Sequence, residues 1–366
     1  MPYSEKVYGE HSYEVLTSSR EGLQRQSDHF ATEQRHDTDG YNVIPFGYCT
    51  YRNRSDDGKF TFNMNKISEN GIVSKFYPVF TFENANSEFM IEYLNSSENI
   101  KKKLAVLAVG TSQVVLSFEA LKKAQFPIPC KAEQDRIAAL LECINRRIVA
   151  QSKIVDSLKK YKRGLVFSIF STSNPYEIAV ESTPLTTLLK EYRNRETTNL
   201  RVCSVAVAKG VVDQLEHLGR RFAASDTSNY GRVKPGDVVY TKSPTGDFPY
   251  GIVKQSWLHE DVAVSPLYGV YTPLNYEVGY LIHTYFEQSS NANNHLRTLA
   301  QKGAKNTINI TTGHFLDKDI PFPIREDEVS MLVGLFSRIN KRIDNEESRL
   351  NKLVLQRKAL MQQLFI

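Results

Sequence analysis

The chain has 366 residues, of which 41% are apolar, and its 46 Lys and Arg against 41 Asp and Glu give a net charge of +5. This length and apolar fraction predict a globular protein of two or three domains, which excludes a disordered chain. The basic charge is compatible with a nucleic-acid partner, although many unrelated proteins share it.

The four cysteines are Cys49, Cys130, Cys143 and Cys203, and no two form a C-x-x-C pair. Their spacing argues against a zinc site or a disulfide framework and favours a reducing cytoplasm. The N-terminal MPYSEKVYGEHSYE is not a signal sequence, and the most apolar run, LAVLAVGTSQVVL from Leu104, is too short and too polar to span a bilayer. We therefore expect a cytoplasmic protein with no membrane partner and no bound metal.

Residues 1–125 form a first mixed segment, rich in Tyr, Phe, Val and turn residues. Alternating apolar residues and β-branched side chains predict mainly short strands joined by long loops. Residues 126–172 follow, opening on Pro127 and Pro129 and continuing as one long helix with an apolar stripe near the 3.6-residue period. Acids at its start and bases at its end match the helix dipole. Its length of about 57 Å, at about 1.5 Å per residue, is that of a strut.

Residues 173–318 form the next segment. The stretch STSNPYEIAVESTP, which starts at Ser171 and runs into this segment, is polar and proline-punctuated and predicts a linker. A second mixed segment follows and loosely repeats the first. YNVIPFGYCTYRNRS from Tyr41 resembles YGRVKPGDVVYTKSP from Tyr230, and GIVSKFYPVFTF from Gly71 resembles DVAVSPLYGVYTP from Asp261. We expect the same mainly β architecture in both.

Residues 319–366 repeat the helix, this time behind Pro321 and Pro323. A constant offset of 195 relates Ile137, Leu140, Ile144, Asn145, Arg147, Ile148, Leu158, Leu165 and Phe170 to Leu332, Leu335, Ile339, Asn340, Arg342, Ile343, Leu353, Leu360 and Phe365. The order is therefore domain, strut, domain, strut. The second strut can bury its stripe only by lying back along the first, so we predict an α+β protein whose two mixed, mainly β domains are separated by two long antiparallel helices with approximate two-fold symmetry.

The predicted core of the helix pair is apolar. Its members are Ile137, Leu141, Ile144, Ile148, Val155, Leu158, Leu165, Leu332, Leu335, Ile339, Ile343, Leu350, Leu353 and Leu360. Gln151 and Glu346 interrupt the two stripes at the same offset. They form either a polar layer that fixes the register of the pair, or a chance pair of partly exposed residues.

Enzyme signatures are absent from the sequence. G-x-x-x-x-G-K-[ST], H-E-x-x-H and G-x-S-x-G do not occur. Asn174-Pro175-Tyr176 lies in the expected linker, and Asp57-Gly58-Lys59 is typical of a turn. We expect no catalytic residue and no cofactor in this chain.

Loops of both mixed segments combine basic with amide or hydroxyl side chains. The candidate DNA-binding residues are Arg20, Gln24, Arg25, Arg52, Arg54, Lys209, Lys242, Ser243, Lys302, Lys305 and Asn306. Lys and Arg contact phosphates, and Arg, Asn and Gln can bond purine edges. Any single one of them could equally be a solvated loop charge. Two similar but unequal readers joined by a strut would engage two different half-sites, about 34 to 36 Å apart.

The doubled P-x-P, the acidic residues that follow it and the terminal LVLQRKALMQQLF resemble the specificity (S) subunit of type I restriction-modification systems, the HsdS family. The resemblance covers essentially the whole chain. It implies that the mixed segments are target recognition domains and that the helices are conserved spacers. It also implies double-stranded DNA, two methylation (M) subunits and restriction (R) subunits as partners. S-adenosylmethionine, ATP and magnesium are implied for those partner subunits.

Two departures from the family accompany this resemblance. The first helix ends in YKRGLVFSIF, and ESTPLTTLLKEYRNRE, which precedes the second domain, has no counterpart before the first, so we expect a shortened first domain. We also expect partner subunits to dock on the helices and on their ends at Phe170 and Phe365. The alternative is a non-catalytic adaptor whose helices space two protein-binding domains. A hidden nuclease or methyltransferase domain is the third reading.

Overall fold

The computed structural model describes residues 1–29, 37–111, 113–171, 174–192, 194, 197, 199–214, 229–242, 244–302, 308–310 and 313–365. The chain forms two compact units. Unit 1 comprises Met1–Ser152 with Ser348–Ile366, and unit 2 comprises Lys153–Glu347. The two long helices thus contribute to both units, whereas the sequence suggested separate ranges for domains and struts.

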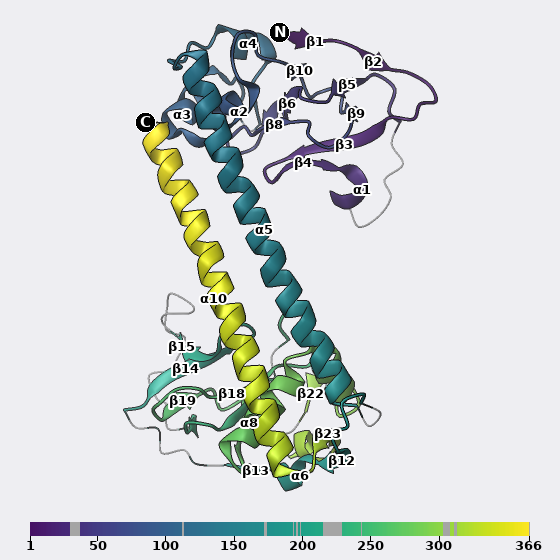
Figure 1. Cartoon of the computed structure of the whole chain (residues 1–366), viewed down its shortest axis with the longest axis vertical. Helices are drawn as coiled ribbons and strands as arrows, with labels where there is room; N and C mark the ends of the chain where they lie inside the picture. The colour runs from purple at the N-terminus through teal and green to yellow at the C-terminus, as the bar shows by residue number, and fades with distance from the viewer. Residues whose placement is uncertain are drawn as a thin grey trace. The chain divides into compact units, whose positions relative to one another are not determined.

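Unit 1 is a mixed domain together with the first part of one long helix and the last part of the other (Figure 1). Its elements are β1 (Pro2–Tyr3), β2 (Lys6–Val7), β3 (Glu14–Ser19), β4 (Gly22–Arg25), α1 (Gln26–His29), β5 (Tyr41–Pro45), β6 (Cys49–Tyr51), β7 (Arg54–Ser55), β8 (Phe62–Met64), β9 (Asn70–Val73), β10 (Val79–Phe80), α2 (Ser87–Ser96), α3 (Glu98–Leu107), β11 (Val114–Val115), α4 (Phe118–Lys123) and the first part of α5 (Lys131–Ile169). Asn86 caps α2 and Ser97 caps α3, because the side chain of each accepts a backbone N–H three residues on.

Unit 2 repeats this plan. Its elements are β12 (Val180–Pro184), α6 (Leu185–Leu188), β13 (Leu189–Glu191), β14 (Arg201–Ala206), β15 (Gly210–Asp213), β16 (Gly231–Val233), β17 (Val238–Tyr240), β18 (Val253–Gln255), β19 (Val262–Val264), β20 (Gly269–Pro273), α8 (Tyr276–Phe286), α9 (Ser289–Arg297), β21 (Gln301–Lys302), β22 (Ile308–Asn309), η2 (His314–Leu316), β23 (Asp319–Pro323) and the first part of α10 (Glu326–Leu364).

The strand order confirms the loose resemblance between the two mixed segments. In unit 1 the larger sheet runs β2-β5-β9-β3-β4 and the smaller β1-β10-β6-β8. In unit 2 the order is β16-β19-β14-β15 and β13-β20-β17-β18. The pairs β3–β9 and β14–β19 are both parallel, in sheets that are otherwise antiparallel. Two chain segments with weak sequence similarity therefore adopt the same topology.

The two helices have equal length. α5 and α10 each contain 39 residues, so each extends about 58 Å at about 1.5 Å per residue. Within unit 1, Leu141 near the start of α5 and Met361 near the end of α10 belong to one buried cluster. Within unit 2, Val166 near the end of α5 packs into the same core as Leu332 near the start of α10. The helices are therefore antiparallel within each unit (Figure 1).

The fourteen residues predicted for the helix-pair core are all buried or half-buried. The buried ones are Leu141, Val155, Leu165, Leu332 and Ile343. Gln151 and Glu346 are each half-buried, one in each unit, and their role as a polar layer stays a prediction.

The predicted linker is wrong in its second half. Val180–Pro184 form β12, which pairs antiparallel with β23 over five residues. The β-branched residues of IAVESTP suit a strand, and their polar neighbours face outward, which is why the sequence looked like a linker. The mixed domains also contain more helix than their alternating patterns indicated, namely α2 to α4 and α8 to α9.

Candidate nucleic-acid interface

A basic cavity lies in unit 1, between the β3–β4 hairpin and the segment from β6 to β8. Its volume is about 520 Å³. Arg20, Arg52, Arg54 and Lys59 line it, together with the hydroxyl residues Thr17, Ser18, Ser19, Ser55 and Thr61. The fold thus brings together three predicted residues: Arg20 in the hairpin turn, Arg52 in the loop after β6, and Arg54, which lies in the strand β7 and not in a loop. Lys59 was missed, because its Asp-Gly-Lys context indicated only a turn.

Arg20 is held at the tip of the hairpin. Its guanidinium pairs with a carboxylate oxygen of Asp57 at 2.7 Å, and its side chain stays 63% exposed. Hydrogen bonds from Ser55, from Arg20 and from the backbone of Lys59 lower the pKa of Asp57 to about 2. Asp57 is therefore ionised at neutral pH and fixes Arg20 at the mouth of the cavity without covering it.

Arg52 and Arg54 follow the central strand β6. Both are exposed, and the guanidinium of Arg54 lies 4.9 Å from the ring centre of Phe76. A stacked guanidinium keeps its edge available for a phosphate or a base. Arg52 and Arg54 both line the basic cavity, so they offer two cations to one ligand face.

Gln24 and Arg25 lie in strand β4 and not in a loop, which corrects the prediction. Gln24 bonds Nδ1 of His29 at 2.9 Å, and Arg25 bonds Glu14 at 3.1 Å. The turn of the hairpin is only two residues long, so the strand begins directly after Glu21. Both side chains are hydrogen-bonded to neighbouring side chains of unit 1, and neither lines the basic cavity.

In unit 2 the predicted residues are spread out. Lys209 is exposed on the β14–β15 turn, and Lys242 is half-buried two residues after β17. β17 occupies the place of β6, so Thr241 stands where Arg52 stands in unit 1, and Lys242 stands where Asn53 stands. Lys302 belongs to β21, but its side chain lies outside the described residues, as do Ser243, Lys305 and Asn306.

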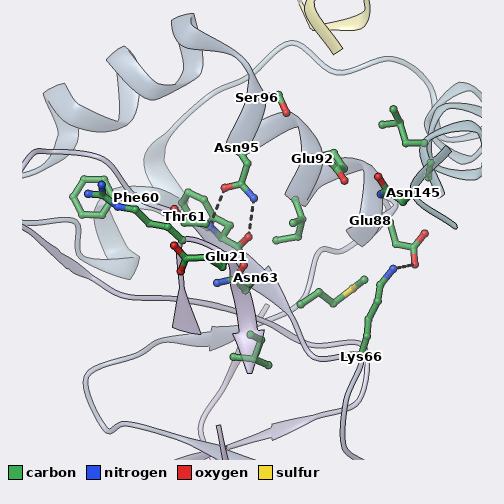
Figure 2. Close-up of a pocket in the computed structure, with 18 of the residues that line it drawn as sticks. Glu21, Phe60, Thr61, Asn63, Lys66, Glu88, Glu92, Asn95, Ser96 and Asn145 are labelled. Carbon is green, nitrogen blue, oxygen red and sulfur yellow. Dashed lines mark hydrogen bonds and ion pairs between the residues drawn. The ribbon is translucent and has the colours of Figure 1, made fainter. Parts of the chain in front are cut away.

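A second cavity of unit 1, about 560 Å³, lies between β4, β8, α2 and the long helices. Figure 2 shows Lys66 beside Glu88, an ion pair of 2.6 Å. The side chain of Asn95 accepts from the backbone N–H of Phe62 and donates to its carbonyl. Glu21, Glu88, Glu92 and Glu142 line this cavity along with its cations. Four carboxylates face five cations here, whereas in the basic cavity two carboxylates, Glu21 and Asp56, face four cations. The basic cavity has the larger excess of positive charge and is the better candidate for DNA.

Phe170 and Phe365 are not docking ends. They are 6% and 5% exposed and belong to the cores of units 2 and 1, respectively. Phe365 packs against Phe89 and Tyr93 of α2, with ring centres 5.6 and 5.5 Å away. Burying a large aromatic ring fixes each helix end to its domain, which explains why this position repeats.

Within the part of the chain that the structure describes, no three His, Cys, Asp or Glu side chains are grouped as metal ligands. None of the described helices is long and apolar enough to cross a membrane. The evidence for a nucleic-acid interface is the basic cavity and the repeated fold.

Part of the sequence and the fold of the chain are similar to known proteins. Residues 4–163 match the model of the type I restriction modification DNA specificity domain. The chain is similar in structure to the type I restriction-modification S subunit from M. genitalium, with a TM-score of 0.55 at 12% identity, over 100% of this chain and 92% of that one.

Two further solved structures are less similar. The HsdS subunit from Thermoanaerobacter tengcongensis gives a TM-score of 0.42 at 16% identity, over 88% of this chain and 80% of that one. A structure describing assembly and conformational transition of the type I R-M system gives a TM-score of 0.48 at 16% identity, over 88% of this chain and 83% of that one. No curated protein matches this sequence.

Proposed function

We propose that this chain, whose residues 4–163 match the type I restriction modification DNA specificity domain, reads a bipartite DNA target for a type I restriction-modification complex. The specificity subunit is the non-catalytic, DNA-recognising member of these systems. One observation carries the proposal most directly: the specificity domain contains the basic cavity of Arg20, Arg52, Arg54 and Lys59. Cations on exposed loops neutralise phosphates, and arginine can also bond guanine.

The target has two unlike halves. Units 1 and 2 share their strand order, which supports a recognition role for both. Their basic residues differ, because Arg52 directly follows β6, whereas Thr241 directly follows β17 and Lys242 comes one position later. Arginine offers a bidentate fork where lysine offers one charge, so the two units prefer different bases. The result is an asymmetric DNA sequence with a gap between its halves.

Methylation subunits, two in number, and restriction subunits are the further partners. The long helices leave apolar side chains in solvent, such as Leu140 (46% exposed) and Val149 (54%) in unit 1 and Phe167 (74%) in unit 2. Exposed apolar side chains on a helix are typical of a protein interface. S-adenosylmethionine, ATP and magnesium belong to those partner subunits in this proposal.

The experiment measures the affinity of the chain, assembled with its methylation subunit, for duplex DNA as salt is raised. A DNA reader loses affinity steeply, with a slope of log K against log salt of about −0.9 for each neutralised phosphate. Complete lack of DNA affinity, with intact assembly, would instead favour a protein adaptor. Methylation or cleavage by the purified chain alone would favour a hidden enzyme domain.

A further inference from the structure

One difference between units 1 and 2 lies at the strand that leads into the long helix. In unit 2, β12 covers β23 in antiparallel pairing, with Val180 opposite Pro323 and Glu181 opposite Phe322. The chain then forms α6, whose Leu185 (0% exposed) and Leu188 (6%) enter the core. Residues 178–188 thus act as a cover for this part of unit 2.

Unit 1 presents the receiving strand without a cover. Residues 125–129 precede α5 as β23 precedes α10, and Pro127 and Pro129 match Pro321 and Pro323. None of the strands in the described part of the chain pairs with residues 125–129. Ile128 is consequently 42% exposed, whereas its counterpart Phe322 is 3% exposed.

An apolar cavity of about 230 Å³ adjoins this bare segment. Phe80, Leu121 and Phe126 line it. Their counterparts in unit 2 are Tyr271 on β20 and Phe315 and Ile320, six residues and one residue before Pro321. These three belong to the buried cluster that includes Leu185 and Leu188.

The residues that follow β10 and β20 support this correspondence between the two units. In unit 2 the N–H of Leu274, just after β20, donates to the carbonyl of Leu188 at 3.0 Å. In unit 1 the residues just after β10, Thr81, Phe82 and Glu83, line the cavity. The hollow in unit 1 therefore occupies the place that α6 fills in unit 2.

We propose that residues 125–129 and this cavity, together the acceptor groove, bind one extended segment of a second polypeptide with the chemistry of residues 178–188. That chemistry is a β-branched strand, then a proline and two leucines three residues apart. Strand addition supplies main-chain hydrogen bonds, and the leucines fill the cavity. Pro127 and Pro129 do not prevent pairing, since β23 pairs with two prolines at the same positions.

The charge around the groove is mixed. Lys122 lines the cavity and pairs with Glu119 at 2.6 Å, Glu83 lines the cavity too, and Lys123 is exposed beside it. The segment that covers unit 2 carries one charged residue, Glu181, so the leucines and the strand pairing carry the proposal. The proposal concerns a protein partner and does not depend on the DNA target.

The probe is a fluorescein-labelled peptide, EIAVESTPLTTLL, with the sequence of residues 177–189, titrated into the full chain by anisotropy. We expect saturable binding of one peptide per chain. A peptide with Leu185→Asp and Leu188→Asp should bind at least tenfold more weakly. The chain variant Ala124→Trp, which fills the cavity, should weaken binding by a similar factor, whereas Ala150→Trp on the exposed side of α5 should not.

A cross-link locates the peptide. In a chain with Cys130→Ser and Cys143→Ser, Ile128→Cys should form a disulfide with a peptide that carries Glu181→Cys, because these positions face each other in the proposed register. Phe46→Cys, at an exposed site away from the groove, should not. Absence of saturable binding would overturn the proposal. So would binding that survives Ala124→Trp, because the peptide would then be replacing β12 in unit 2.

Discussion

The guanidinium of Arg357 on α10 bonds both carboxylate oxygens of Glu92 on α2, at 2.7 and 2.8 Å, and its Nε bonds Asn145 of α5 at 2.6 Å. In unit 2, Lys162 of α5 pairs with Glu287 at the end of α8, and Asn340 donates to Tyr280 at 2.8 Å. Arg357 and Asn145 are related to Lys162 and Asn340 by the same 195-residue offset. Each unit therefore fastens its domain to the helices with a cation from equivalent positions. The equivalent amide joins the two helices in unit 1 and joins α10 to α8 in unit 2.

Arg357→Ala should destabilise unit 1 by about 1–2 kcal/mol, because it removes charge-assisted hydrogen bonds that are partly shielded from water. Urea unfolding followed by circular dichroism measures the change. Arg357→Lys should recover part of the loss, since it restores the charge but not the bidentate geometry. In a double-mutant cycle with Glu92→Gln, a coupling energy near zero would show that the pair contributes nothing.

Arg52→Ala and Arg54→Ala should each weaken DNA binding by the assembled complex and reduce the magnitude of the salt slope by about 0.9 per lost phosphate contact. Lys103→Ala removes the same charge from an exposed position of α3 and should change neither quantity by a comparable amount. Equal effects from all three substitutions would indicate non-specific attraction and would argue against the basic cavity.

Acid should destabilise unit 2 through His283. Burial, followed by the charge of Lys254, lowers the pKa of His283 to about 3, and its Nδ1 accepts the N–H of Gln255 at 3.0 Å. The unfolded chain takes up this proton below about pH 6.5, whereas the folded chain does not. The contribution of neutral His283 to the free energy of unfolding is therefore fully present above pH 6.5, and it falls by about 1.4 kcal/mol per pH unit below that pH.

Burial also lowers the pKa of His295, to about 4. His295 therefore adds a second, similar dependence of the unfolding free energy on pH. His283→Gln, which keeps an acceptor, should halve the combined contribution between pH 6 and 5. Trp257, the single tryptophan, stacks on His283 with ring centres 4.6 Å apart, so its fluorescence reports unfolding of this unit. An unchanged slope in the variant would mean that other groups govern the acid response.

Removing four residues from each long helix, around Gln151 and around Glu346, tests whether the helices set the gap in the target. Each helix becomes about 6 Å shorter at about 1.5 Å per residue. The preferred gap should shrink by about two base pairs, as read from the methylated sequence. Retention of the original gap would show that the helices do not determine the spacing.

The long helices were predictable because a sustained 3.6-residue stripe, proline starts and an exact repeat all agree on them. The strands of the mixed domains were predictable as a class but not in order, because pairing between distant segments such as β3 and β9 leaves no local pattern. β12 was missed since half of its residues are polar, and its identity as a strand depends on β23, more than 130 residues away.

The candidate site was predictable only in part. Arg20, Arg52 and Arg54 were chosen as loop cations, and the fold brings them together. Gln24 and Arg25 are sequence neighbours of Arg20 but lie in a strand, because a two-residue turn returns the chain at once to the sheet. Lys59 belongs to the cavity through the folding of a turn onto the hairpin, which no pattern in its own sequence indicates.

The most direct test of the proposed function is methylation mapping of DNA from cells that express this chain together with its methylation subunit, compared with cells that lack the chain. We expect adenine methylation confined to one gapped, asymmetric motif, with one half lost when Arg52 and Arg54 are both replaced by alanine. An unchanged methylation pattern, with the two proteins assembled, would contradict the assignment of this chain as a bipartite DNA reader.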